Sequence, residues 1–191
     1  MRISFTGEMC YEINIPSSYA KSLWTKCFKI GQEYNITPYG TEAMHVLRAE
    51  KGFIIVGQET DGSVTPIDLD MNWIVSKKKY DFIGKRALSR SDTIREDRKQ
   101  LVGILTKDPK EILEEGAQLV TKVTTPPMEM IGHISSSYFS PNLGRSIALG
   151  LVKEGKNKKG LKIFAPMPNK IIEAEITSPV FIDPSNERLS L

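Results

Sequence analysis

The sequence predicts an α+β protein whose helices and strands occupy different parts of the chain. Apolar residues recur at helical spacing within residues 17–52, whereas residues 99–178 are dominated by strand patterns separated by turn residues. The 191 residues are 40% hydrophobic and 26% charged, which is ordinary for a folded globular protein and argues against disorder or a coiled coil. An all-β protein is the second alternative.

The chain is predicted to begin with a β-hairpin. Alternating apolar side chains flank a turn at residues 6–8 on both sides: Ile3, Phe5, Tyr11, Ile13 and Ile15. A period of two is typical of a strand with one face buried. The hairpin therefore forms the first element of an α+β part.

Two amphipathic helices are predicted to follow the hairpin. The residues after Pro16 start a helix over about 17–34, with Trp24 and Phe28 on its apolar face. The second helix begins near Gly40, where Thr41 can act as the N-cap, and it stops at Gly52.

The next segment is predicted to alternate strands with loops. The apolar run at 53–56 suits a buried strand, residues 57–66 are rich in turn formers, and residues 69–75 alternate as a second strand. A short helix is expected from 83 to 88. The charged run after it predicts a boundary near 92–98, which divides the chain into domains at 1–95 and 96–191.

The second domain is predicted to be a small antiparallel β-barrel or sandwich. Six short segments have strand character and are separated by Gly, Pro, Asn or Lys turns: QLVGIL, AQLVTKV, MIGHISSSY, SIALGLV, LKIFAP and KIIEAEIT. No helix longer than about three turns is expected within 99–178. A lysine-rich segment at 153–162 should form a solvated turn between two of these strands.

Composition excludes several classes of protein. The formal net charge is +3 with no basic half, so nucleic acid is not an expected partner. No apolar run approaches the roughly 20 residues that span a bilayer, and no secretory signal precedes the first strand, so we expect a cytoplasmic protein with no membrane partner. Cys10 and Cys27 are too few for a disulfide framework and suggest free thiols.

Common catalytic motifs are missing from the sequence. There is no glycine-rich dinucleotide fingerprint, phosphate-binding P-loop, paired-histidine zinc motif or serine nucleophile motif. His45 and His133 have no neighbouring acid or thiol at ligand spacing, so no metal site is expected and a structural role is preferred for both. No catalytic residue is identified.

Two carboxylates near the predicted hairpin turn could bind a planar ligand. Glu8 and Glu12 lie four residues apart, so they can share one face if the turn adds no residue. A carboxylate accepts two parallel hydrogen bonds from a planar N–C–N edge, as in a guanidinium group or a pterin. Solvated acids on a surface strand are the alternative.

Five strings occur in order along nearly the whole chain: R-I-S-F-T-G-E-x-x-Y-E-I (2–13), T-P-Y-G-T-E-A-M-H-V-L-R-A-E-K-G (37–52), G-Q-E-T-D-G-S-V-T-P (57–66), K-K-Y-D-F-I-G-K-R-A-L (78–88) and G-H-I-S-S-S-Y (132–138). Together they resemble the folate-binding region at the carboxy-terminal end of sarcosine oxidase alpha subunits, within the glycine cleavage T-protein (aminomethyltransferase) family. Any one string is weak, but five in this order make the resemblance specific.

The resemblance implies a tetrahydrofolate-binding protein. The fold it implies is part of a ferredoxin-like domain followed by a small antiparallel β-barrel. Glu12 matches the family's pterin-binding glutamate, Thr6 and Glu8 would shape the turn, and Tyr11 would make a lesser contact. Arg48 matches an arginine that we interpret as mainly structural.

Met44 stands where many aminomethyltransferases carry an arginine. This departure disfavours aminomethyl transfer and favours the oxidase branch, in which sarcosine is oxidatively demethylated and tetrahydrofolate receives the one-carbon unit. For the complete complex the resemblance implies FMN, FAD, NAD and other sarcosine oxidase subunits.

Because the chain enters a strand directly, we expect a fragment or a split gene product, inactive alone and able to form a homo-oligomer through exposed apolar surface. The alternatives are an aminomethyltransferase-like folate-binding protein and a non-catalytic folate-domain fragment.

Overall fold

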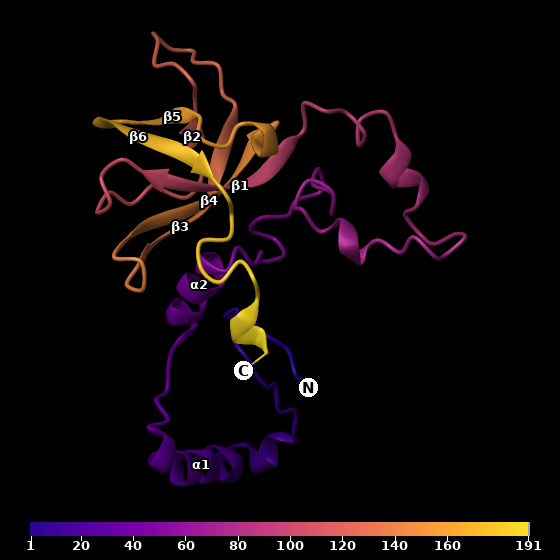
Figure 1. Ribbon diagram of the computed structural model, residues 1–191, viewed down its shortest axis with the longest axis vertical. Helices are drawn as coiled ribbons and strands as arrows, with labels where there is room; N and C mark the ends of the chain where they lie inside the picture. Colours follow the sequence, from indigo (N-terminus) through magenta and orange to yellow (C-terminus); the bar gives the residue numbers. More distant parts are fainter. Residues whose placement is uncertain (191) are drawn as a thin grey trace.

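The computed structural model describes residues 1–190 and combines one curled antiparallel sheet with two α-helices and long loops (Figure 1). The helices are α1 (Ala20–Gly31) and α2 (Thr41–Glu50). The strands are β1 (Lys99–Thr106), β2 (Gln118–Leu119), β3 (Gly132–Ser140), β4 (Arg145–Lys153), β5 (Lys162–Met167) and β6 (Lys170–Thr177). None of the helices in the described part of the chain is long and apolar enough to span a bilayer.

The six strands form one sheet in the order β2-β3-β4-β1-β6-β5, with all neighbours antiparallel. An isolated bridge joins Val120, just after β2, to Phe164 in β5, and each backbone N–H donates to the other residue's carbonyl at 2.9 Å. The two edges of the sheet therefore meet at one point. The sheet curls toward a barrel, but its ladder of strand pairs is not closed.

Strands β1 and β4 are buried on both faces of the sheet. Successive residues of β1 point to opposite sides, so Val102 and Ile104 join the larger core while Leu101 joins a second core that includes Ala49 of α2 and Leu69. Because both faces of these two strands are buried, their sequences are apolar at nearly every position. Helix α2 thereby covers the outer face of the sheet beside β3 and β4 (Figure 1).

Both predicted helices are confirmed, with one change at a cap. Helix α1 and its flanking 3₁₀ turns fill residues 17–34 without a break. In α2, Thr41 is the first helical residue rather than the cap, and Gly40 takes the N-cap position. Gly52 ends this segment at a φ of +72°, where a Cβ would lie 2.5 Å from the carbonyl oxygen of Pro179.

The predicted strand at 53–56 is wrong because side chains satisfy its backbone. The carbonyl of Phe53 accepts a hydrogen bond from Arg48 Nη1 at 3.1 Å, and the Ile55 N–H donates to the Glu59 carboxylate at 2.7 Å. These bonds replace the neighbouring strand that an extended segment would need.

The strand predicted at 69–75 and the helix predicted at 83–88 are also wrong. Residues 69–75 form successive turns, including a 3₁₀ turn at Asn72–Ile74, and Asp70 has a φ of +62°. Gly84 has a φ of +95°, which interrupts helical geometry, so only a 3₁₀ turn at Arg86–Ser89 forms. The predicted hairpin is reduced to one bridge between Arg2 and Tyr11.

Candidate functional site

The predicted folate-contacting carboxylates lie on the paired segment at the start of the chain, but they face different partners. The Glu12 N–H donates to the Met1 carbonyl at 2.8 Å, and its half-buried side chain accepts a hydrogen bond from Asn14 Nδ2 at 3.0 Å. Glu8 is exposed, with Oε1 3.5 Å from Arg188 Nη1. Among the described residues, the two carboxylates therefore share no partner.

The other two predicted contacts differ in burial. Thr6 is buried, and its Oγ1 lies 3.3 Å from Cys10 Sγ. Tyr11 is 66% exposed, and its hydroxyl donates to Met9 Sδ at 3.8 Å. Cys10 and Cys27 are both free thiols.

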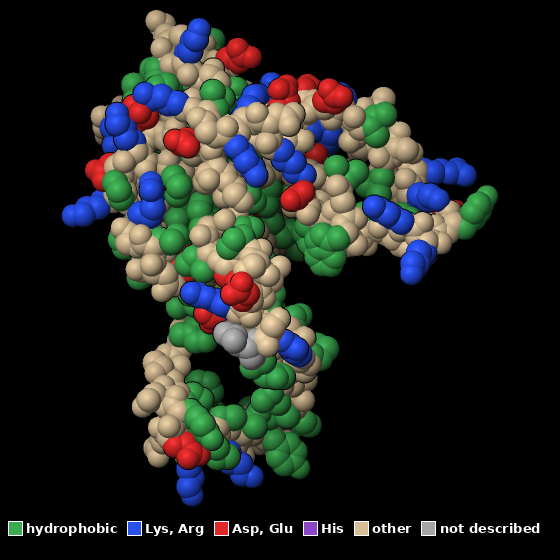
Figure 2. Space-filling view, in the orientation of Figure 1, with side chains coloured by type: hydrophobic (Ala, Val, Ile, Leu, Met, Phe, Trp, Pro, Cys, Tyr) green, Lys and Arg blue, Asp and Glu red, His purple; other side chains and the backbone are tan. Residues whose placement is uncertain are grey.

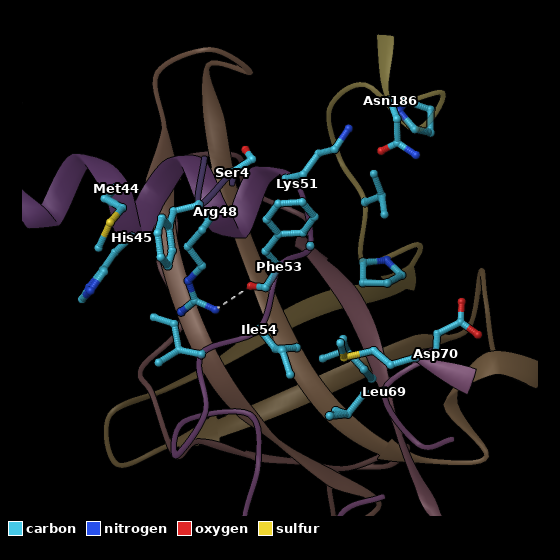
Figure 3. A pocket seen from close by; sticks show the side chains of 18 of the residues that line it. Ser4, Met44, His45, Arg48, Lys51, Phe53, Ile54, Leu69, Asp70 and Asn186 are labelled. Atoms are coloured by element: carbon cyan, nitrogen blue, oxygen red, sulfur yellow. Dashed lines mark hydrogen bonds between the residues drawn. The ribbon is translucent and has the colours of Figure 1, made fainter. Parts of the chain in front are cut away.

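A cavity of about 490 Å³ lies between α2, the 52–55 and 69–73 segments and the residues after β6 (Figure 3). Apolar side chains dominate its lining, among them Phe53, Ile54, Leu69 and Trp73. Ser4 and Phe5 also line it, whereas Thr6, Glu8, Tyr11 and Glu12 do not. The volume falls within the range of small-molecule sites, roughly 300–1,000 Å³.

Helix α2 places three further side chains at this cavity. Met44, His45 and Arg48 lie together along one side of it, and the Arg48 guanidinium points toward the Phe53 carbonyl (Figure 3). Positions 44 and 45 lie four and three residues before position 48, so each shares a helix face with Arg48. Sequence reasoning did not assign Phe53, Trp73 or His45 to a site. The spacing of three residues between His45 and Arg48 on one predicted helix was a signal for His45, and no local pattern pointed to Phe53 or Trp73.

Behind the cavity, Arg48 and Glu59 form a buried ion pair with Nη1 and Oε2 3.0 Å apart. Arg48 Nη2 also donates to Ser136 Oγ at 2.7 Å and lies 3.4 Å from the Tyr138 hydroxyl. The Arg48 Nε is buried without a hydrogen-bond partner within residues 1–190. This network joins α2 to the sheet and agrees with a mainly structural role for Arg48.

A β-bulge in β3 supplies the hydroxyl groups of this network. Strand pairing with β4 shifts between Ile134 and Ser136, and Ser135 and Ser136 both donate to the same Glu59 oxygen, Ser135 at 3.1 Å. A bulge puts two residues opposite one, which lets adjacent side chains reach one side. Gln58 Nε2 adds a 2.9 Å bond to Ser136 Oγ.

The two histidines occupy different surroundings. His45 lies at the cavity, its ring centre 6.5 Å from that of Tyr138. His133 is the second residue of β3 and is paired on both sides, with β2 and β4. Burial lowers its pKa and the charge of Lys99 lowers it further, whereas the charge of Asp61 acts to raise it. Across residues 1–190, no three His, Cys, Asp or Glu side chains gather in a way that could hold a metal ion.

Comparison with known families decides the assignment. The GCVT N-terminal domain matches residues 1–79, and the glycine cleavage T-protein C-terminal barrel domain matches residues 99–183. The chain belongs to the glycine cleavage T-protein family. The resemblance inferred from the five strings is thereby confirmed.

Sarcosine oxidase alpha subunits and aminomethyltransferases are both among the proteins that this chain resembles. The chain is 51% identical to sarcosine oxidase subunit alpha from Corynebacterium sp. strain P-1 and 38% identical to that from Rhizobium meliloti, in each case over 98% of the chain. It is 32% identical to an aminomethyltransferase from Thermoanaerobacter pseudethanolicus over 94% of the chain. It spans 20%, 19% and 47% of these three proteins, respectively.

A solved structure has the same fold. The aminomethyltransferase T of the glycine cleavage system from Bartonella henselae superposes with a TM-score of 0.81 at 26% identity, covering 95% of this chain and 49% of that protein. Within this T-protein fold, Arg48, Glu59 and Ser136 come from three different matching strings and meet in one buried network. The T-protein motifs thus include the residues that join α2 to the sheet.

Proposed function

We propose that this chain is the carboxy-terminal folate-binding part of a sarcosine oxidase alpha subunit. The observation that carries the proposal is the identity of 38–51% to three such subunits over 98% of the chain, against 31–33% to aminomethyltransferases. Met44, in place of the arginine of many aminomethyltransferases, supports the same branch. The domains are taken as 1–95 and 96–191, the second completing a β-barrel in the assembled protein.

In this proposal, Glu12 holds the amino edge of the pterin. Its carboxylate can exchange the single bond from Asn14 for two parallel bonds from the ring N–H and the 2-amino group. The cavity receives the neighbouring aromatic part of the folate, against Phe53 and Trp73. Met1 pairs with Glu12, and Ser4 at the cavity lies three positions after Met1, which corresponds to roughly 10 Å along an extended segment.

The oxidation itself requires groups that this chain is not expected to carry. Removal of a hydride from sarcosine needs an acceptor that side chains do not provide, and bound flavin supplies that chemistry. We assign FMN, FAD and NAD to the remainder of a cytoplasmic complex with other sarcosine oxidase subunits. This chain binds and orients tetrahydrofolate so that it accepts the one-carbon unit, and alone it self-associates.

Calorimetry with tetrahydrofolate on the purified chain tests the folate site. Replacing Glu12 with Ala should weaken binding by about 1.5–3 kcal/mol, the usual contribution of hydrogen bonds to a charged group. Replacing Glu33, an exposed carboxylate beyond α1, should leave the affinity unchanged. Equal affinities of the wild type and the Glu12→Ala variant would remove Glu12 from the site.

Activity of the isolated chain provides a second test. We expect a colourless protein that releases no peroxide with sarcosine, because it has no hydride acceptor. Stoichiometric bound flavin together with turnover by this chain would contradict the proposal.

Aminomethyl transfer is the second candidate, favoured by the superposition on the Bartonella henselae enzyme. Electron flow in the full-length protein distinguishes the two, because an oxidase reduces a bound acceptor when it consumes its amine, whereas a transferase reduces none.

A further inference from the structure

The carboxy-terminal tail, defined here as residues 178–190, runs from the sheet to the first residues of the chain. After β6 it passes α2, where the N–H groups of Phe181 and Ile182 both donate to the Glu50 carbonyl at 2.9 Å. It then reaches the amino-terminal segment, and the two ends of the chain lie close together (Figure 1). The tail therefore contacts both α2 and the region of the proposed folate site.

A buried ion pair fixes the tail to the end of α2. Lys51 Nζ lies 2.7 Å from Asp183 Oδ2, and the two side chains are only 4% and 7% exposed. Lys51 Nζ also donates to the Asp183 backbone carbonyl. Because both charges are removed from water, loss of one partner would leave the other uncompensated.

Asp183 in turn shapes the rest of the tail. Its carboxylate accepts the backbone N–H of Glu187 at 2.9 Å and that of Arg188 at 3.2 Å. The hydrogen bond from Lys51 is the largest influence that lowers the pKa of Asp183. One carboxylate thus fixes the conformation of residues 183–188.

The shaped tail holds the amino-terminal turn in place. The Met9 N–H donates to the Arg188 carbonyl at 3.0 Å, and the Arg2 guanidinium donates to the Leu189 carbonyl. Gly7 also rests on the stem of Lys51, where a Cβ would lie 2.6 Å from Lys51 Cγ. The turn therefore contacts both Lys51 and the tail.

We infer that Lys51 and Asp183 are positioning residues for the folate site: they fix the tail, and the tail orders the segment that carries Glu12. The inference rests on the proposed function, since Glu12 is its pterin ligand. A segment that is ordered before the ligand arrives loses less conformational entropy on binding, which improves affinity without any contact to the ligand. Lys51 also lines the cavity, whereas Asp183 does not, and the inferred role requires neither side chain to touch the pterin.

The test uses the full chain, tetrahydrofolate as the ligand and the Asp183→Asn variant. We expect binding about three- to tenfold weaker than in the wild type, the cost of ordering a few side chains on binding. The Met9 amide should exchange faster with solvent in the free variant and regain protection at saturating tetrahydrofolate. The matched control is Glu173→Gln, which removes an ion pair with Lys162 on the sheet and should change neither quantity.

The outcomes separate this inference from the proposed function. If wild type binds tetrahydrofolate and Asp183→Asn binds equally well with unchanged Met9 exchange, the positioning role is overturned. If wild type does not bind tetrahydrofolate, the proposed function fails, and faster Met9 exchange would show only the coupling of tail and turn. If Asp183→Asn does not fold, a chain that ends at Asn186 tests the inference instead. This chain keeps the ion pair between Lys51 and Asp183 but lacks the contacts that Arg188 and Leu189 make with the amino-terminal segment. An unchanged affinity for tetrahydrofolate in that chain overturns the inference.

Discussion

The sheet buries apolar side chains on both of its faces, whereas residues 1–98 leave most of theirs exposed. Ala49 and Leu69 are the buried hydrophobic residues before residue 98, and the others lie between 101 and 176. On the face shown in Figure 2, exposed apolar side chains gather around α1, at the end of the molecule away from the sheet. The sheet therefore carries most of the hydrophobic stabilisation, and the α1 region offers apolar surface that a partner or a second copy could cover.

Packing partners explain this difference. Strands β1 and β4 each have two hydrogen-bonded neighbours and a core on both faces. Helix α1 packs mainly against its own flanking turns, and its Trp24 and Phe28 rings contact each other at a tilt of 42°, with 4.7 Å between centroids. An amphipathic helix is stabilised mostly by burial of its apolar face. By that criterion α1 depends less on the sheet than α2 does.

Polar anchors join the remainder of residues 1–98 to the sheet. The Glu50 carboxylate accepts hydrogen bonds from Ser140 and, at 2.8 Å, from Asn142. Arg48 reaches β3 through Ser136. These contacts involve α2 rather than α1, so the comparison predicts that damage to the anchors destabilises the protein while damage to α1 does not.

Removal of the buried carboxylate should have the largest effect. In Glu59→Gln the Arg48 guanidinium keeps its charge inside the protein without a counter-ion, which should cost about 3–5 kcal/mol of unfolding free energy. Urea denaturation followed by circular dichroism measures this difference. The control is Glu173→Gln, whose solvated ion pairs should contribute no resolvable stability. Equal urea midpoints for wild type and Glu59→Gln would mean that the network does not support the fold.

Local sequence patterns predicted the sheet but not this network. Five of the six predicted strand segments became strands of nearly the expected length, since the alternation of apolar residues is set by burial on each face. In the sixth, residues 117–123, only Gln118–Leu119 pair as a strand. Arg48 and Ser136 lie 88 residues apart, and no local period signals such a pairing.

The error at residues 53–56 shows what a local pattern omits. The run at 53–56 has the composition of a buried strand, but Arg48 and Glu59 satisfy its polar backbone groups in place of a neighbouring strand. Apolar composition indicates that a segment is buried, but it does not indicate which groups form hydrogen bonds with the backbone of that segment. For Glu12, the proposed pterin contact rests on the resemblance, and the structure adds a hydrogen bond from Asn14.

Acid should weaken a second anchor, the pair of Asp68 and Arg98. Arg98 Nη2 lies 2.7 Å from the Asp68 carboxylate, which also accepts the Thr65 N–H at 2.8 Å. Burial acts to raise the pKa of Asp68, but the hydrogen bonds from Arg98 and Thr65 prevail and lower it. Because the folded-state pKa lies below the unfolded value, about 3.9, this stabilisation is complete above that pH and is lost as the pH falls through the folded-state pKa.

Asp68→Asn should therefore destabilise the protein by about 1.5–3 kcal/mol at pH 7, the contribution of hydrogen bonds to a charged group. Urea denaturation at several pH values from about 2 to 7, which span the usual carboxylate pKa values, measures the difference in unfolding free energy between wild type and variant. The difference from wild type should shrink below about pH 4, as the wild-type carboxyl becomes protonated. A difference that stays constant across this range would show that the carboxylate charge does not stabilise the contact.

The smallest effect is expected in α1, and one matched pair of substitutions measures the contrast between the two regions. Ile30 is 65% exposed, so Ile30→Ala removes little buried surface and gains helix propensity; the unfolding free energy should change by less than about 0.5 kcal/mol. Ile104 is 0% exposed in β1, so Ile104→Ala should cost about 2–5 kcal/mol through lost burial and a cavity. Urea denaturation of the full chain provides both values at low protein concentration. If Ile30→Ala is as costly as Ile104→Ala, the apolar face of α1 is already buried in solution, and a protein-concentration dependence of that cost would identify a second copy as what covers it.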